Sequence, residues 1–285
     1  MRCSRTGRIP KRGSPEVASI HPTAIVDEDC ALAEDVVVGP FSIIRNGATV
    51  GARTVVDAHV LLEHCDIGCD CQIGYGTALG GPPQDQHYQG EPTRVIVGNR
   101  TVIREYVTVH RATGEGSATR IGDDNMLMAM THLGHNCEVG NGVTIATLSG
   151  MSGHTIIEDK VIIGGMVGSH QKVRVGKLAM VSGHSKISQD VPPFSLVDGK
   201  PARVVGPNLV GLRRVGIDQA NRQALQRAFR LIYRSGAELG RALAQVKDEL
   251  GEFSEVRYLV EFLARVREGR VGRQQEAASG VPRKS

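Results

Sequence analysis

Apolar side chains recur at every sixth residue through most of the chain. From Ile20 to Leu62 each sixth residue is aliphatic, and from Ile121 to Ile187 the frame is broken at Ser169 alone. A period of six is neither that of an amphipathic helix nor the alternation of a half-exposed strand. It is the hexapeptide signature of a parallel β-helix, in which three hexads make one triangular coil. Because coils stack their aliphatic side chains on one another, each buried side chain contributes roughly 1.5–3 kcal/mol.

Two segments interrupt this frame, and we expect both to leave the stack as loops. They span residues 80–94 and 111–119, and near residue 61 the frame also slips by one residue. Binding and catalytic residues concentrate on loops that a rigid scaffold positions. The two segments are therefore candidates for carrying function.

The hexad pattern ends near residue 190, and a helical pattern follows it. Pro192 and Pro193 stop the repeat, and Asp218 and Ser254 are candidate N-caps of two helices. The sequence therefore predicts a mostly β chain with four parts. These are a basic disordered tail at residues 1–18, a parallel β-helix at 19–205 with the two loops, a helical domain at 206–271 and a flexible tail at 272–285.

The charge balance gives little support to nucleic-acid binding. The first fifteen residues carry five basic groups and no acidic one, and without them the net charge falls from +4 to −1. This tail lacks the apolar region of a secretory signal, which leaves an organelle transit peptide as its functional alternative. No run of 18 apolar residues occurs. We therefore expect a cytoplasmic protein without stable membrane insertion.

Several histidines fall where successive coils return to the same side of the stack. One coil beyond His135 lies close to His154, and the next coil reaches His170 and Gln171. We expect these side chains, with His132 nearby, to form a column. Outward imidazoles become useful when a neighbouring subunit covers them. Parallel β-helices of this kind usually assemble as trimers, so we expect a homotrimer. Such a column can supply a general base, binding donors or metal ligands.

Two arrangements raise the alternative of a metal site. Cys65, Cys69 and Cys71 cluster beside His64, but their spacing matches no strong zinc pattern. His59 and His64 are five residues apart and resemble a zinc-binding pair on a β-helix, but no third histidine lies at the matching phase. We therefore expect neither a metal nor a cofactor.

Eight short motifs follow one another along the chain. They are IHPTAIV (20–26), QDxxYxGEPTR (84–94), IRExVTVHR (103–111), THLGHNC (131–137), SGH (152–154), IIGG…HQ (162–171), QDVPPF (189–194) and NLVGLRRVGI (208–217). Together they resemble the acyl-[acyl-carrier-protein]–UDP-N-acetylglucosamine O-acyltransferase family over about residues 20–270. The GEPTR loop and the GLRR element make the resemblance specific, because hexapeptide proteins in general do not share them.

The resemblance implies both a fold and a reaction. The coils are expected to wind left-handed. The enzyme is expected to move an (R)-3-hydroxyacyl chain from acyl carrier protein to the 3-hydroxyl of UDP-N-acetylglucosamine, the first step of lipid A biosynthesis. Attack of a sugar hydroxyl on a thioester needs a base, and imidazole titrates close to the working pH. By the match to the family motif, this base is His135.

The resemblance also implies the other site residues. The backbone N–H of Gly153 is expected to stabilise the oxyanion, and Asp85 to bind the sugar. The acyl groove runs past Gly183, which leaves room for long chains. The remaining expected substrate-binding residues are His87, His132, His154, His170, Gln171, Asn208 and Arg214.

Three positions depart from the family pattern. Asn136 follows the base where Asp is usual, His87 replaces a Lys, and Val210 replaces a Glu found in some members. An amide can orient the imidazole but carries no charge to stabilise its protonated form. These departures leave the acceptor sugar open between UDP-N-acetylglucosamine and its 3-amino analogue.

The helical domain carries a net positive charge. Residues 200–270 hold 14 Lys or Arg and 8 Asp or Glu, a net +6 that suits an acidic acyl carrier protein.

The main alternative to this function is that of the later UDP-3-O-acylglucosamine N-acyltransferase, which carries an additional N-terminal domain for which we expect no room before Ile20. A coenzyme A-dependent acetyltransferase or a non-catalytic scaffold would also be compatible with the repeat.

Overall fold

The structure, a computed structural model, describes residues 18–269 and 272–274. The predicted basic tail therefore lies outside the described residues apart from Ala18. The chain divides into two compact units, Met1–Gly150 and Met151–Ser285. Both contain short parallel strands of a β-helix, as the hexad period predicts, and the second also contains helices.

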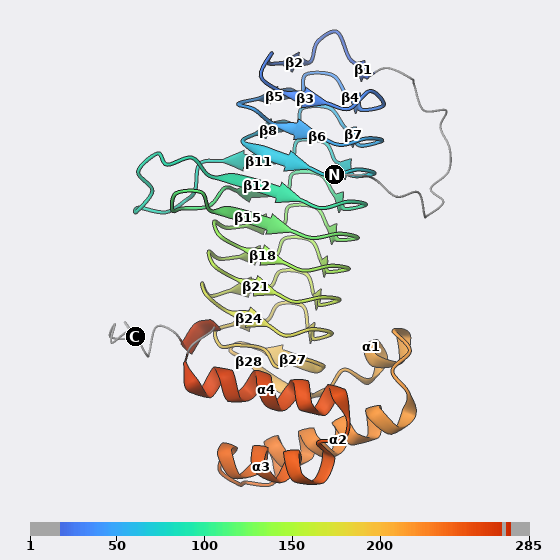
Figure 1. The fold of residues 1–285 in the computed structure, drawn as a ribbon, viewed down its shortest axis with the longest axis vertical. Coiled ribbons are helices and arrows are strands. Elements are labelled where there is room, and N and C mark those ends of the chain that lie inside the picture. Colours follow the sequence, from blue (N-terminus) through green and yellow to red (C-terminus); the bar gives the residue numbers. More distant parts are fainter. Residues whose placement is uncertain (1–17, 270–271, 275–285) are drawn as a thin grey trace. The chain divides into compact units, whose positions relative to one another are not determined.

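Three parallel sheets form the sides of the coils in the first unit, and successive strands of the chain join them in turn (Figure 1). The first sheet contains β1 (Ser19–Ile20), β4 (Val37–Val38), β7 (Val55–Val56), β10 (Gln72–Ile73), β13 (Val102–Ile103), β16 (Met126–Leu127) and β19 (Thr144–Ile145). The second contains β2 (Ile25–Val26), β5 (Ile43–Arg45), β8 (Leu61–Glu63), β11 (Ala78–Gly81), β14 (Thr108–His110) and β17 (His132–Leu133). The third contains β3 (Ala31–Leu32), β6 (Thr49–Val50), β9 (Cys65–Ile67), β12 (Arg94–Val97), β15 (Ala118–Ile121) and β18 (Glu138–Val139).

The inward-facing aliphatic side chains form the core of this unit. The first position, Ile20, is exposed, and the sixth-residue frame becomes fully buried from Val38 onward. Ser19 pairs with Val37, which sets the length of an uninterrupted coil, whereas Thr49 pairs with Asp66, so that coil is one residue shorter. The shorter coil accounts for the predicted slip. Inward residues exposed by no more than 4% include Val38, Ile44, Val50, Val56, Leu62, Ile67, Ile73 and Leu79.

The two interruptions of the hexad frame are loops that leave the stack. Asp66 pairs with Ile96, and Ile96 pairs with Arg120, so both of these coils are longer than an uninterrupted one. The surplus residues form loop 82–93, between β11 and β12, and loop 111–117, between β14 and β15. Figure 1 shows both loops projecting from the same side of the coils. They lie within the predicted segments 80–94 and 111–119.

The turns between sheets place many non-glycine residues at positive φ, and the three corners of the coils differ in chemistry. At the turns that follow the first sheet, most of these residues in the first unit are large and apolar, and we call them the apolar corner. Their side chains are 46–57% exposed. They are Phe41, Tyr106, Met130 and Leu148.

The other two corners carry polar residues at positive φ. After the third sheet, Arg53 makes an ion pair with Asp70 at 2.6 Å, and Arg100 pairs with Asp124 at 2.7 Å. After the second sheet lies the corner from which the two loops project, and Asn136 occupies one of its turns. Asn and Asp adopt this backbone conformation more readily than bulky residues do.

The second unit continues the repeat and ends in helices. Its strands are β21 (Ile156–Ile157), β22 (Ile162–Ile163), β23 (Gly168–Ser169), β24 (Arg174–Val175), β25 (Met180–Val181), β26 (Lys186–Ile187), β27 (Ser195–Gly199) and β28 (Ala202–Pro207). The strand β20 (Gly150–Met151) falls at the division between the units. The helices are α1 (Leu209–Arg214), α2 (Gln219–Arg234), α3 (Leu239–Leu250), α4 (Ser254–Glu268) and the 3₁₀ turn η1 (Gly272–Gln274).

The helices share one apolar cluster, and their caps test two predictions. Asp218 caps α2 as predicted, because its carboxylate accepts the N–H of Asn221 at 2.9 Å. The prediction that Ser254 caps α4 is wrong: Ser254 is the first helical residue, and Phe253 precedes it without a side-chain cap. The cluster includes Phe194, Leu212, Leu225, Phe229, Val246, Leu259 and Phe262.

A largely buried carboxylate joins α4 to the last coils. Glu158 accepts hydrogen bonds from the Tyr258 hydroxyl at 2.7 Å, the Lys177 N–H at 2.8 Å and the Arg174 Nε at 2.7 Å. The Arg174 guanidinium also lies 4.4 Å above the Phe262 ring. Burial, followed by the neighbouring Glu158 charge, raises the pKa of Tyr258 to about 12. The Tyr258 hydroxyl therefore stays protonated and donates to Glu158 at physiological pH.

Gly80 fixes the point at which loop 82–93 leaves the coils, and an added methyl group there should be costly. Gly80 has φ +90°, and a Cβ would lie 1.5 Å from the Glu63 carbonyl oxygen. Gly80→Ala should therefore lower the free energy of unfolding by at least about 2 kcal/mol. Gly81→Ala is the matched control, since a Cβ at Gly81 meets nothing within 4 Å. Equal denaturation midpoints for the two variants would contradict this assignment.

Candidate active site

The candidate site residues are distributed over both units. Asp85, His87, His132 and His135 belong to the first unit, and the others belong to the second. The column expected from His135, His154 and His170 joins the two units and stays a prediction. Within the first unit the structure brings together a cluster around His135.

The turn after β17 fixes the imidazole of His135. Its Nδ1 lies 2.9 Å from Oδ1 of Asn136, which occupies the left-handed turn position with φ +57°. The same Oδ1 accepts the N–H of Thr113 at 2.9 Å, and the Asn136 Nδ2 donates to the Thr113 carbonyl at 3.0 Å. These contacts set the amide orientation, so His135 Nδ1 must be the protonated nitrogen that donates to Oδ1. The Nε2 of His135 then carries the lone pair that can accept a proton.

Asp85 reaches the same imidazole from loop 82–93. Its Oδ2 lies 3.8 Å from His135 Nδ1, and both side chains are largely buried, with 16% and 12% of their surface exposed. The other oxygen, Oδ1, accepts the His87 N–H at 3.1 Å and lies 2.9 Å from His87 Nδ1. The backbone N–H of His87, and then its ring, lower the pKa of Asp85 to about 2. Asp85 is therefore a carboxylate at every physiological pH.

His132 and His110 form a second imidazole pair on the strands beside this turn. His132 Nδ1 lies 2.8 Å from the Thr108 hydroxyl on the neighbouring strand β14. The rings of His110 and His132 meet edge to face, with centroids 5.3 Å apart. Burial lowers the pKa of His132, and the positive charge available on His110 lowers it further. A neutral His132 suits hydrogen bonding to a substrate better than proton storage.

Several residues that position this cluster were not identified from the sequence. His110 Nδ1 lies 2.5 Å from the Pro82 carbonyl, at the start of loop 82–93. Arg111 donates to the Gly80 carbonyl at 3.0 Å and to the Tyr88 hydroxyl at 2.8 Å. Both belong to the IRExVTVHR motif, so the motif pointed to them although the hexad spacing did not.

The two loops are also joined to each other. The Glu91 carboxylate accepts the Gly114 N–H at 2.7 Å, and the Gly116 N–H donates to the Pro92 carbonyl at 3.2 Å. Loop 82–93, which holds Asp85, and loop 111–117, which orients Asn136, therefore hold each other in place.

The second unit contains the other site residues that the resemblance assigns to the coils. Gly153 is buried and its carbonyl accepts the Lys172 N–H at 3.0 Å, while His154 is exposed at a left-handed turn with φ +59°. His170 is exposed beside Gln171, and its Nε2 lies 3.2 Å from Nη2 of Arg273. Arg273 belongs to η1, in the segment 272–285 that the sequence assigned to a flexible tail; residues 275–285 lie outside the described part of the chain.

Of the residues expected at the nucleotide and the acyl chain, Asn208 is hydrogen-bonded within the protein, whereas Arg214 and Gly183 are exposed. The Asn208 amide caps α1 by accepting the Gly211 N–H at 3.0 Å, and it donates to the Leu178 carbonyl at 2.9 Å. Arg214 is exposed in the last turn of α1. Gly183 is exposed, and a Cβ there would lie 3.2 Å from the Gly165 carbonyl oxygen. A larger residue at position 183 would therefore occupy open surface next to that carbonyl.

The residues of the metal alternative do not converge in the structure. Cys65 and Cys71 are buried, and the Cys71 thiol donates to the Gly98 carbonyl at 3.1 Å. His59 instead stacks on Phe41 at the apolar corner, with ring centroids 5.0 Å apart. Over residues 18–269 and 272–274, no group of three His, Cys, Asp or Glu side chains is placed to hold a metal ion.

Comparison with known proteins places these residues in a family context. A model described as UDP N-acetylglucosamine O-acyltransferase, domain 2, matches residues 190–271, and a bacterial transferase hexapeptide model matches residues 118–153. The acyl-[acyl-carrier-protein]–UDP-N-acetylglucosamine O-acyltransferase of Synechocystis sp. is 46% identical over 245 residues, which are 86% of this chain and 87% of that protein.

Solved structures agree in both fold and extent. LpxA from Acinetobacter baumannii superposes with a TM-score of 0.83 at 36% identity, covering 89% of this chain and 98% of that one. The UDP-N-acetylglucosamine O-acyltransferase (LpxA) from Moraxella catarrhalis gives a TM-score of 0.82 at 34% identity, over the same shares of the two chains.

The contact between Asn136 and Thr113 predicts a local effect on hydrogen exchange. Asn136→Gly keeps a residue that tolerates φ +57° but removes the amide that holds loop 111–117. The Thr113 N–H should then exchange at least about fivefold faster, because one hydrogen bond contributes about 1 kcal/mol or more. Exchange at Val109, inside β14, serves as the internal control. An unchanged Thr113 rate would show that Asn136 does not hold the loop.

Proposed function

Because this chain belongs to the acyl-[acyl-carrier-protein]–UDP-N-acetylglucosamine O-acyltransferase family, we propose that it transfers an (R)-3-hydroxyacyl chain from acyl carrier protein to the 3-hydroxyl of UDP-N-acetylglucosamine. This reaction is the first step of lipid A biosynthesis. The observation that carries the proposal is the oriented His135, held by Asn136 beside the Asp85 carboxylate, in a chain so similar to these enzymes.

The proposed mechanism uses His135 as the general base. The 3-hydroxyl oxygen attacks the thioester carbonyl carbon while its proton moves to His135 Nε2. The resulting tetrahedral oxyanion accepts a hydrogen bond from the Gly153 N–H. Collapse of this intermediate breaks the carbon–sulfur bond, and the departing carrier-protein thiolate takes the proton from the imidazolium. His135 therefore ends the cycle neutral.

The other candidate residues bind the two substrates in this proposal. Asp85 lies beside the base, His87 contacts Asp85, and His132 lies on the strand that precedes the base; all three suit the sugar. His154, His170, Gln171, Asn208 and Arg214 are assigned to the nucleotide and its diphosphate, and Gly183 to the acyl groove. Because His87 replaces a lysine, an assay should offer both the N-acetylglucosamine nucleotide and its 3-amino analogue.

The apolar corner supports assembly of the chain as a homotrimer. Phe41, Tyr106, Met130 and Leu148 combine two unfavourable properties, since each is exposed and each is bulky at positive φ. The turns at the other two corners of the first unit carry Asn, Asp, Arg, His or Gly at positive φ. A second copy that packs against the apolar corner would bury its exposed side chains. Three copies around a threefold axis parallel to the β-helix axis would cover the apolar corner of every copy. This arrangement also brings a neighbouring subunit toward the second sheet of the first unit, which carries His110 and His132.

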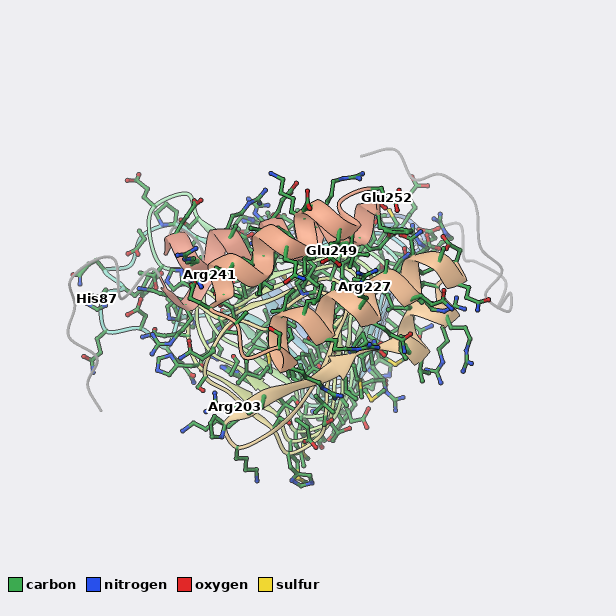
Figure 2. The ribbon with its side chains drawn as sticks, turned by 90° about the horizontal axis from the view of Figure 1, so that it is seen from below. His87, Arg203, Arg227, Arg241, Glu249 and Glu252 are labelled. Atoms are coloured by element: carbon green, nitrogen blue, oxygen red, sulfur yellow. The ribbon has the colours of Figure 1, made fainter. Side chains whose placement is uncertain are left out.

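The helical region supports docking of an acidic carrier protein. The sequence of α2 contains no acidic residue, and its Arg227, Arg230 and Arg234 are exposed. In Figure 2 Arg227 and Arg241 lie on the outer helices, with Glu249 nearby to pair with Arg227. Among the described helices, none has the length and apolar composition needed to cross a bilayer. From the resemblance to this family we propose that the reaction takes place in the cytoplasm.

Loss of the base should abolish turnover without affecting the fold. His135→Ala is expected to reduce kcat by at least about a hundredfold with hydroxyacyl carrier protein and UDP-N-acetylglucosamine, while circular dichroism and thermal midpoint stay close to the parent. Acetyl-coenzyme A is the control donor for the parent protein. Retained activity in the variant would show that the base has been misassigned, and acetyl transfer alone by the parent would overturn the proposed reaction.

A charge at the apolar corner should disrupt assembly. Leu148→Asp replaces a bulky residue at φ +63° with one that tolerates this backbone, so the monomer itself should not be strained. Light scattering should detect a trimer for the parent and smaller species for the variant. Lys160→Asp, an exposed residue also at positive φ but in the turn after β21, is the matched control and should remain trimeric. A trimeric Leu148→Asp would place the interface elsewhere.

A further inference from the structure

We propose that Asp85 is the charged partner of His135, a positioning residue through which loop 82–93 stabilises the protonated base during the transfer. This role is separate from the sugar binding assigned to Asp85 above. It rests on the proposed function, in which His135 takes up a proton from the substrate.

Asn136 orients the imidazole of His135 but cannot stabilise its protonated form by charge. Its Oδ1 holds the His135 Nδ1–H at 2.9 Å, and its contacts with Thr113 prevent the amide from flipping. Orientation and tautomer are therefore set. An amide has no net charge, however, so it offers the imidazolium no ionic stabilisation. A neighbouring group must supply that charge if the site is to have it.

Asp85 meets the requirements for that group. Its Oδ2 lies 3.8 Å from His135 Nδ1, within the range in which opposite charges interact strongly. The titratable groups that contact or face the carboxylate are His87 on the same loop, at 2.9 Å, His135 itself and the more distant Glu91. Its low pKa, about 2, keeps it ionised throughout the working range.

The loop holds this carboxylate in a fixed position. His110 contacts the carbonyl of Pro82, and Arg111 bonds the Gly80 carbonyl and the Tyr88 hydroxyl, so loop 82–93 is held on both sides of Asp85. A charge that is already in place when the proton arrives stabilises the imidazolium without reorganisation. The separation of 3.8 Å between Oδ2 and Nδ1 is longer than a hydrogen bond, which favours a charge interaction over a second orienting contact.

The sharpest test moves the charge from the loop to position 136. Asp85→Asn removes the charge while keeping an oxygen acceptor for the His87 N–H, and kcat should fall about 10- to 100-fold. Asn136→Asp in the Asp85→Asn background should restore most of that loss, because the carboxylate is returned to His135 Nδ1. Glu115→Gln is the matched control, since it removes an exposed carboxylate from the neighbouring loop 111–117 and should change kcat by less than about threefold.

A role confined to sugar binding predicts a different pattern. In that case Asp85→Asn should raise KM for the nucleotide sugar, and the second substitution should not rescue kcat. The pH profile gives an independent readout: the acid limb of kcat should move to lower pH in Asp85→Asn, because the imidazolium loses its counter-charge, and should return in the double variant. No rescue and an unmoved limb would overturn the proposal.

The failure of this inference can be separated from failure of the proposed function. The ring resonances of His135 can be followed by NMR against pH in the protein without substrate. A protonation curve that moves to lower pH in Asp85→Asn and returns with Asn136→Asp supports the charge interaction, whichever acyl donor the enzyme accepts. A curve unchanged in both variants rejects it, even if the parent transfers hydroxyacyl chains.

Discussion

The stacking of inward aliphatic side chains on the coils above and below is the interaction on which this structure depends. Because an uninterrupted coil returns each inward position to the same side, side chains such as Ile44 and Leu62 meet directly, and the backbone at each corner is fixed by the same repeat. The packed interior tolerates few changes of side chain, whereas the side chains at the corners point away from that interior. Each corner could therefore acquire its own chemistry: apolar residues, ion pairs, or histidines with loops.

Separation of core and corner explains how the candidate base is held. His135 and Asn136 occupy one turn between β17 and β18, where the buried Leu133 and Val139 fix the chain on either side. Asn136 adopts the left-handed conformation that the turn requires, and the same residue uses its side chain to orient the base. The loops then add contacts that the repeat cannot supply. A single loss at Asn136 therefore affects the turn, the base and loop 111–117 together.

The sequence specified the repeat better than the site. The period of six predicted the inward positions, the two loops and Asp218 as a helix cap, because each depends on neighbouring residues. The contacts of His110 with Pro82, and of Arg273 with His170, join residues that are 28 and 103 positions apart. No local pattern encodes them. The cap at Ser254 was misplaced by one residue, since Ser at the first helical position satisfies the same sequence rule. Asn208 caps α1 through its amide, a contact that the sequence did not predict, and its place at the nucleotide stays a prediction.

The substitution of an amide next to the base has a physical consequence that extends beyond the turn. An Asp at position 136 would combine orientation and charge in one side chain, whereas Asn136 supplies orientation alone. The charge then comes from Asp85, whose position depends on how loop 82–93 is held by β14 and by loop 111–117. Proton affinity at His135 thus becomes sensitive to the loop, which in the proposed function also contacts the sugar. Because these contacts fix the loop before any substrate arrives, the counter-charge is already in place when the acceptor hydroxyl gives up its proton.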